Sequence, residues 1–97
     1  MIRHVVLWQF KPGLSADRKE AFHAAVSALP DQISAIARMA CGPALHLQPS
    51  DVDYVLEVDF ADPGAFRKYK DHDAHRLLID EHVRPCVEVS VRAQVQL

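Results

Sequence analysis

The stretch that decides the fold is IRHVVLWQF, at residues 2–10. It is rich in β-branched and aromatic residues, which favour β-strands. Alternate residues of a strand point to opposite faces of the sheet. One face of this predicted strand carries Ile2, His4, Val6, Trp8 and Phe10. The other carries Val5 and Leu7, so both faces are partly apolar, and we expect a central strand covered on two sides.

A helix is predicted next, with Ser15 as its N-cap. Its apolar stripe repeats at helical spacing and consists of Phe22, Ala25, Val26 and Leu29. We expect this helix to stop before Pro30. A weaker strand follows at 36–41, closed by Gly42-Pro43 and a loop.

The second half of the chain repeats this order. Residues 53–60 alternate as a strand, and Asp62-Pro63 is a strong helix start. We expect a break at 71–73, with Asp73 capping a second helical piece that ends before Pro85. Residues 87–97 alternate again and predict a long final strand. The order is therefore β-α-β-β-α-β, an α+β ferredoxin-like fold with a four-stranded antiparallel sheet.

The chain of 97 residues predicts a single domain over residues 1–97. In the ferredoxin-like arrangement the helices cover one face of the sheet and leave the other bare. Val5, Leu7 and Val55 are expected on that bare face, which is too apolar to face water. A second identical sheet would cover it, so we expect a homodimer through the sheet faces.

The charge balance excludes several partners. Eleven Lys and Arg against 13 Asp and Glu leave a net charge of −2. The basic residues at 67–70 are offset by Asp71 and Asp73, so no basic stripe for nucleic acid remains. No run approaches the roughly 20 apolar residues of a membrane span, and no signal-peptide pattern is present at the N-terminus.

Cys41 and Cys86 form no disulfide framework, which favours a cytoplasmic protein.

Two segments carry a family resemblance: IRHVVLWQFKPG at 2–13 and FRKYKDHDAHRLLIDEHVRPCVEVSV at 66–91. The chain resembles the stress-responsive α/β-barrel (Dabb) family of small dimeric proteins. The most specific features are the His of the first strand and a Y-x-x-H-x-x-H segment leading into a helix. The resemblance implies a ferredoxin-like dimer whose two sheets face each other as a dimeric α/β barrel. It also implies a pocket between the sheet and helices of each protomer, suited to a small apolar ligand.

One branch of this family consists of plant polyketide cyclases of the olivetolic acid cyclase type, which close a linear polyketide without a cofactor. By resemblance, His75 is the catalytic base, Tyr69 assists it, and His4 lines the substrate pocket. Two positions depart from that branch: Asp73 replaces a Pro, and Tyr54, a candidate substrate-binding residue, replaces a second strand His. The cyclase substrate therefore does not carry over.

Each of these residues also has a purely structural interpretation. His75 can line its helix, Tyr69 and Tyr54 can fill the core, and His4 can be a hydrogen-bonded core histidine. Six residues and a helix break separate Tyr69 from His75, so the sequence alone does not bring them together.

Other chemistries have less support. Asp71, His72, Asp73 and His75 are potential metal ligands, but an H-x-x-H pair without an assured third ligand is a weak metal motif. Neither cysteine has an adjacent base, and the three glycines form no phosphate loop. We therefore expect no metal and no cofactor.

Three functional hypotheses follow. The first is cofactor-free acid–base catalysis on a small apolar carbonyl or polyketide-type compound. The second is a non-catalytic dimer that binds a small ligand or acts as a stress-response protein. The third, a cofactor-independent monooxygenase on the same barrel, has no residue that selects it.

Overall fold

The first strand lies inside a four-stranded antiparallel sheet in the computed structural model, which describes residues 1–97. The strands are β1 (Ile2–Phe10), β2 (Arg38–Pro43), β3 (Tyr54–Phe60) and β4 (Val87–Gln96). Their order across the sheet is β2-β3-β1-β4, so β1 pairs with β3 on one side and β4 on the other. This arrangement confirms the predicted ferredoxin-like fold.

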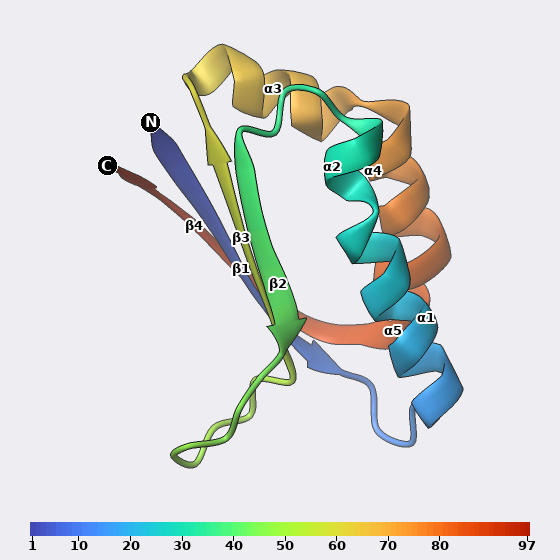
Figure 1. Cartoon of the computed structure of the whole chain (residues 1–97). Coiled ribbons are helices and arrows are strands. Elements are labelled where there is room, and N and C mark those ends of the chain that lie inside the picture. The colour runs from blue at the N-terminus through green and yellow to red at the C-terminus, as the bar shows by residue number, and fades with distance from the viewer.

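The helices form a single layer against one face of the sheet (Figure 1). They are α1 (Ala16–Ser27), α2 (Leu29–Gln32), α3 (Pro63–Asp71), α4 (Asp73–Leu78), the π-helix η1 (Ile79–Val83) and α5 (Arg84–Cys86). None of them has the length and apolar composition needed to span a lipid bilayer.

One predicted helix end is confirmed and the other was wrong. α1 ends at Ser27, before Pro30, and a separate short helix, α2, begins after it at Leu29. The second helical run, in contrast, continues through Pro85 to Cys86 in α5. Pro30 stands in the first turn of α2, where the backbone N–H that proline lacks would have no intrahelical partner. A proline that looks like a stop signal can therefore also begin a new short helix.

The predicted break between α3 and α4 is present, but its cap differs. The Nδ1 atom of His72, not the carboxylate of Asp73, accepts a hydrogen bond of 3.0 Å from the backbone N–H of Ala74. β2 lies two residues later than predicted, because Gly42 and Pro43 still pair with β3. Proline is tolerated there because β2 is an edge strand.

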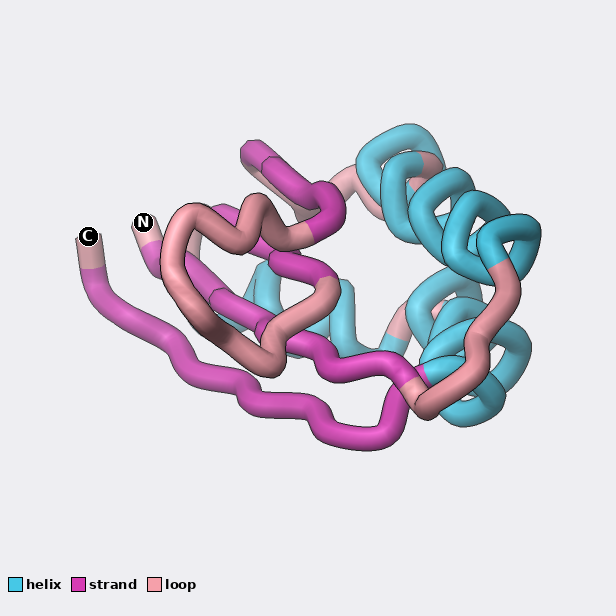
Figure 2. The backbone as a smooth tube through the Cα atoms, turned by 90° about the horizontal axis from the view of Figure 1, so that it is seen from below, coloured by secondary structure: helices cyan, strands magenta, loops and turns pink.

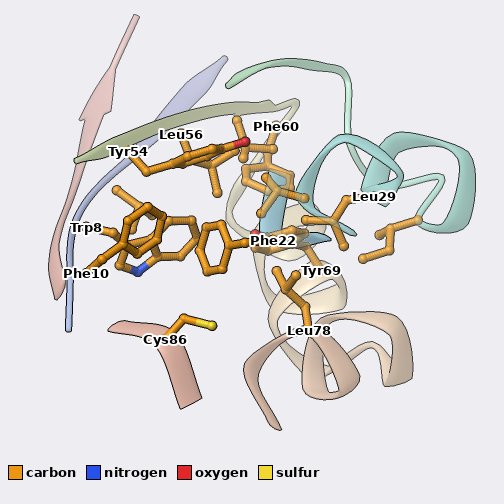
Figure 3. Packing of buried hydrophobic residues seen from close by; sticks show 14 residues of the cluster. Trp8, Phe10, Phe22, Leu29, Tyr54, Leu56, Phe60, Tyr69, Leu78 and Cys86 are labelled. Atoms are coloured by element: carbon orange, nitrogen blue, oxygen red, sulfur yellow. The ribbon is translucent and has the colours of Figure 1, made fainter. Parts of the chain in front are cut away.

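The core lies between the sheet and the helices and is built from the even-numbered residues of β1 and β3. The rings of Trp8, Phe10 and Tyr54 surround Phe22 of α1 (Figure 3). Their ring centroids lie 5.0–5.2 Å from that of Phe22, mostly edge to face, an arrangement that adds to the stabilisation from buried area. Phe22 itself is completely buried.

The opposite face of the sheet has no helices against it (Figure 2). Val5, Leu7 and Val55 alternate with the core residues and are only half-buried, as expected for this bare face. β4 adds an exposed apolar row of Val89, Val91 and Val95, each about half exposed. The pairing of Leu7 with Val91 makes this row continuous with β1.

Replacing Phe22 with Ala tests the core. We expect a loss of about 3–5 kcal/mol in the free energy of unfolding, because the cavity would lie among three aromatic rings. Leu77→Ala is the control, since Leu77 is 55% exposed and should change stability by no more than about 0.5 kcal/mol. Chemical denaturation at one protein concentration measures both variants. Similar values for the two would contradict this description of the core.

Candidate functional site

β1 places His4 on the helix-facing side of the sheet, with only 6% of the residue exposed. The β1–β4 register sets Gln94 beside it, and Gln94 Nε2 donates a hydrogen bond of 2.8 Å to His4 Nδ1. Burial, followed by the charges of His75 and Arg92, lowers the pKa of His4 to about 4. His4 is therefore neutral at pH 7. Because Nδ1 accepts a hydrogen bond, its ring proton lies on Nε2.

The break at His72 brings Tyr69 and His75 together. α3 ends there in an extended conformation (φ −70°, ψ 142°), and α4 then restarts. As a result the rings of Tyr69 and His75 lie in contact, with centroids 4.6 Å apart and planes tilted by 58°. Tyr69 also lies edge to face with His4 at 6.2 Å. The three side chains form one row from β1 to α4.

This row lines a cavity of about 420 Å³ between β1, β4 and the α3–α4 break. Its full lining is His4, Phe66, Tyr69, Lys70, His75, Arg92 and Gln94. A second hollow of about 150 Å³ shares His4, Tyr69, His75 and Arg92 with it, and continues inward to apolar residues. The apolar residues of this inner hollow include Val6, Trp8, Leu56, Leu78, Ile79 and Val83. The site thus has an apolar interior and a polar, cationic mouth, and its size suits a small ligand.

The electrostatics leave His75 neutral and able to accept a proton. Burial lowers its pKa, the backbone of Lys70 and the charge of Asp71 oppose this, and the charges of Lys70 and Arg92 reinforce it. A neutral imidazole has one unprotonated ring nitrogen, which can accept a proton.

Tyr69 retains its proton over the same pH range. The residue is 2% exposed, and burial raises its pKa to about 12. Its hydroxyl is therefore a hydrogen-bond donor at neutral pH. An unprotonated imidazole beside a protonated phenol is a pair that can remove one proton while stabilising a developing oxyanion.

Tyr54 lies apart from this cavity. Its hydroxyl hydrogen-bonds with His23 Nδ1, and its ring packs against Phe22 and Trp8. Burial is the main cause that raises its pKa above the usual value. The structure thus joins His4, Tyr69 and His75 in one site and puts Tyr54 in the core.

Sequence reasoning missed the other polar residues of the cavity, namely Lys70, Arg92 and Gln94. In the sequence, Arg92 and Gln94 are polar residues of the alternating final strand. The signal that could have identified them is the antiparallel pairing of β4 with β1, which aligns Gln94 with His4 and Arg92 with Val6. That alignment depends on the register, which the alternation alone leaves open.

The acidic and histidine residues around the α3–α4 break have structural roles. His72 caps α4, and Asp73 forms an ion pair with Arg76. No group of three or more His, Cys, Asp or Glu side chains is arranged to hold a metal ion.

Comparison with solved structures gives close matches in fold. A dimeric ferredoxin-like protein of unknown function from Thermobifida fusca is 29% identical, with a TM-score of 0.89 over 99% of this chain and 90% of that one. A Dabb family protein from Mesorhizobium loti is 21% identical, with a TM-score of 0.85 over 99% and 95%. A hydroxynitrile lyase from Passiflora edulis is 17% identical, with a TM-score of 0.87 over 99% and 92%. At 21% and 17% identity, the likeness to the proteins from Mesorhizobium loti and Passiflora edulis concerns the fold alone.

No curated protein matches the sequence. The family model described as the stress responsive A/B barrel domain, Dabb, matches residues 2–95. This match contains all the helices and the strands β1–β3, and β4 up to Val95. The chain therefore belongs to the stress-responsive A/B barrel domain (Dabb) family.

Proposed function

We propose that the protein catalyses cofactor-free proton transfer on a small, largely apolar carbonyl compound. The observation that carries this proposal is the row of His4, Tyr69 and His75 along one cavity of ligand size. The inner hollow would hold the apolar part of the substrate, and the row would hold its carbonyl group.

In the proposed step, the unprotonated nitrogen of His75 removes a proton from the carbon next to the carbonyl. The C–H electron pair becomes the enolate double bond, and the negative charge moves to the carbonyl oxygen. The hydroxyl of Tyr69 and the Nε2–H of His4 donate hydrogen bonds to that oxygen. The enolate then takes the proton back from His75, or its carbon attacks a second carbonyl, as in a cyclisation. In the second case the oxygen of the attacked carbonyl takes the proton from His75, which restores the base.

A second candidate is ligand binding without turnover. A general base works best with a pKa near the working pH, and burial lowers that of His75 below the ordinary value. The same cavity could then hold a ligand by shape and hydrogen bonds alone. Binding without proton exchange would favour this candidate over catalysis.

We further propose that the protein is a homodimer through the bare sheet face. The half-exposed row of Val89, Val91 and Val95 continues onto Val5 and Leu7 of β1. A matching sheet would remove this apolar surface from water, at roughly 25 cal/mol per Å². The relative from Thermobifida fusca is a dimeric ferredoxin-like protein, which supports a dimer here.

A cytoplasmic location is part of the proposal. Cys86 is fully buried, Cys41 is half-buried, and both are free thiols. Free thiols persist in a reducing compartment such as the cytoplasm.

Exchange of α-protons for deuterium in acetophenone and 4-acetylbenzoate, followed by NMR, tests the catalytic proposal. We expect the wild-type protein to accelerate exchange over buffer. His75→Gln should lower this acceleration by about 10²–10⁴-fold and Tyr69→Phe by about 10²-fold, because they remove the base and an oxyanion donor. His46→Gln is the control, since His46 lies on the exposed 44–50 loop away from the cavity. Equal rates for wild type and His75→Gln would refute the assignment of the base.

The pH dependence of the exchange gives a separate prediction. Because the pKa of His75 lies below its ordinary value of about 6.5, the catalysed rate should fall at acid pH with a midpoint below 6.5. Lys70→Gln removes a positive charge that lowers this pKa, so the fall should move to higher pH. NMR titration of the His75 ring provides the matching measurement. An acid limb above pH 6.5 in the wild type would be inconsistent with a buried base.

Light scattering tests the dimer. The wild type should have twice the chain mass of 10.9 kDa. Val91→Asp should yield monomers, because it sets a charge in the middle of the apolar row. Leu77→Asp is the matched control, since Leu77 is 55% and Val91 54% exposed but Leu77 lies on the helix layer. A Val91→Asp protein that remains dimeric would place the interface elsewhere.

A further inference from the structure

The mouth of the cavity holds two positive charges without a negative partner. Lys70 comes from the last turn of α3 and Arg92 from the middle of β4, and both line the 420 Å³ cavity. The other lining residues are His4, Phe66, Tyr69, His75 and Gln94, none of which carries a negative charge at neutral pH. The lining is therefore cationic although the chain as a whole has a net charge of −2.

Lys70 and Arg92 lack ion-pair partners, although other cations of the protein have them. The four ion pairs of the protein engage Arg3, Arg38, Arg76 and Arg84, and neither Lys70 nor Arg92 takes part in any of them. Asp71 and Asp80 line an adjoining hollow together with Lys70 and His75, but neither acid lines the 420 Å³ cavity. Lys70 and Arg92 face a shared space from two elements far apart in the sequence.

Two like charges on one cavity are unfavourable to each other unless an anion lies between them. Both charges already act on the site, since each lowers the pKa of His75. A guanidinium offers paired N–H donors that match a carboxylate, and an ammonium adds a mobile point charge. The two groups together suit a carboxylate at the mouth of the cavity.

We propose that Lys70 and Arg92 form a carboxylate subsite, so that the ligand is an aromatic or otherwise apolar keto acid. This inference rests on the proposed function for the carbonyl end of the ligand. The carboxylate lies between Lys70 and Arg92, the apolar body packs against Phe66 and the inner hollow, and the carbonyl reaches Tyr69 and His75. The same two cations favour the enolate over the neutral ketone, because negative charge grows beside them.

Binding of two ligands of the same shape tests the subsite. The probes are 4-acetylbenzoate, which carries a carboxylate, and 4-acetylbenzamide, which is neutral. Trp8 is the single tryptophan and lines the inner hollow, so its fluorescence reports occupancy, and calorimetry gives the affinity. We expect the wild type to bind 4-acetylbenzoate at least tenfold more tightly than 4-acetylbenzamide at 20 mM NaCl. This preference should shrink at 500 mM NaCl, because salt screens the attraction between charges.

Substitutions test whether the preference for the carboxylate depends on Lys70 and Arg92 or on surface charge in general. Arg92→Gln and Lys70→Gln should each weaken binding of 4-acetylbenzoate several-fold and leave 4-acetylbenzamide unchanged, and Arg92→Glu should abolish the preference. Arg67→Gln is the matched control, because Arg67 is an exposed cation of α3 that does not line the cavity. Equal affinity of the wild type for the two probes, or equal losses in Arg92→Gln and Arg67→Gln, would overturn the subsite.

The binding experiment tests the subsite and the exchange experiment tests the catalytic proposal, so that either proposal can fail without the other. A benzoate preference in a protein that exchanges no protons would leave the subsite standing and remove the catalytic proposal. Exchange of acetophenone and 4-acetylbenzoate at equal rates, without a binding preference, would remove the subsite and leave the catalytic proposal standing. His75→Gln should lose exchange and keep the preference for the carboxylate.

Discussion

The structure depends on the pairing of β1 with both β3 and β4 in a single register. Because a strand alternates its side chains, this one register decides what each face of the sheet carries. It sends His4, Val6 and Trp8 toward the helices and leaves Val5 and Leu7 on the bare face. A slip by one residue would exchange the two sets, so that the core, the cavity and the apolar outer face would be lost together.

The helix layer adds a second constraint at the α3–α4 break. A continuous helix through 63–78 would place residues six apart on different sides, since α-helical neighbours are three or four residues apart. His72 interrupts the helix and caps the next one, which returns His75 to the ring of Tyr69. The residue between the two functional positions of the motif thus has a structural role in making them neighbours.

Burial controls the chemistry of the site. It lowers the pKa values of both histidines and raises that of Tyr69, so neutral acid and base groups coexist at pH 7. The charged groups, Lys70 and Arg92, remain exposed at the mouth. The cavity therefore separates a neutral reactive row from a positive rim, and this division is the basis of the keto-acid proposal.

The sequence by itself determined the element order, the ferredoxin-like fold and the apolar nature of both sheet faces, because periodicity and turn residues are local signals. It also singled out His4, Tyr69 and His75, through a motif and a family resemblance. It missed Lys70, Arg92 and Gln94, and it grouped Tyr54 with the site although that ring packs beside Phe22. Only the tertiary structure decided these points, because strand register and the angle at a helix break arise from contacts between distant segments. Alternation in one strand states which residues share a face, but it does not state what that face meets.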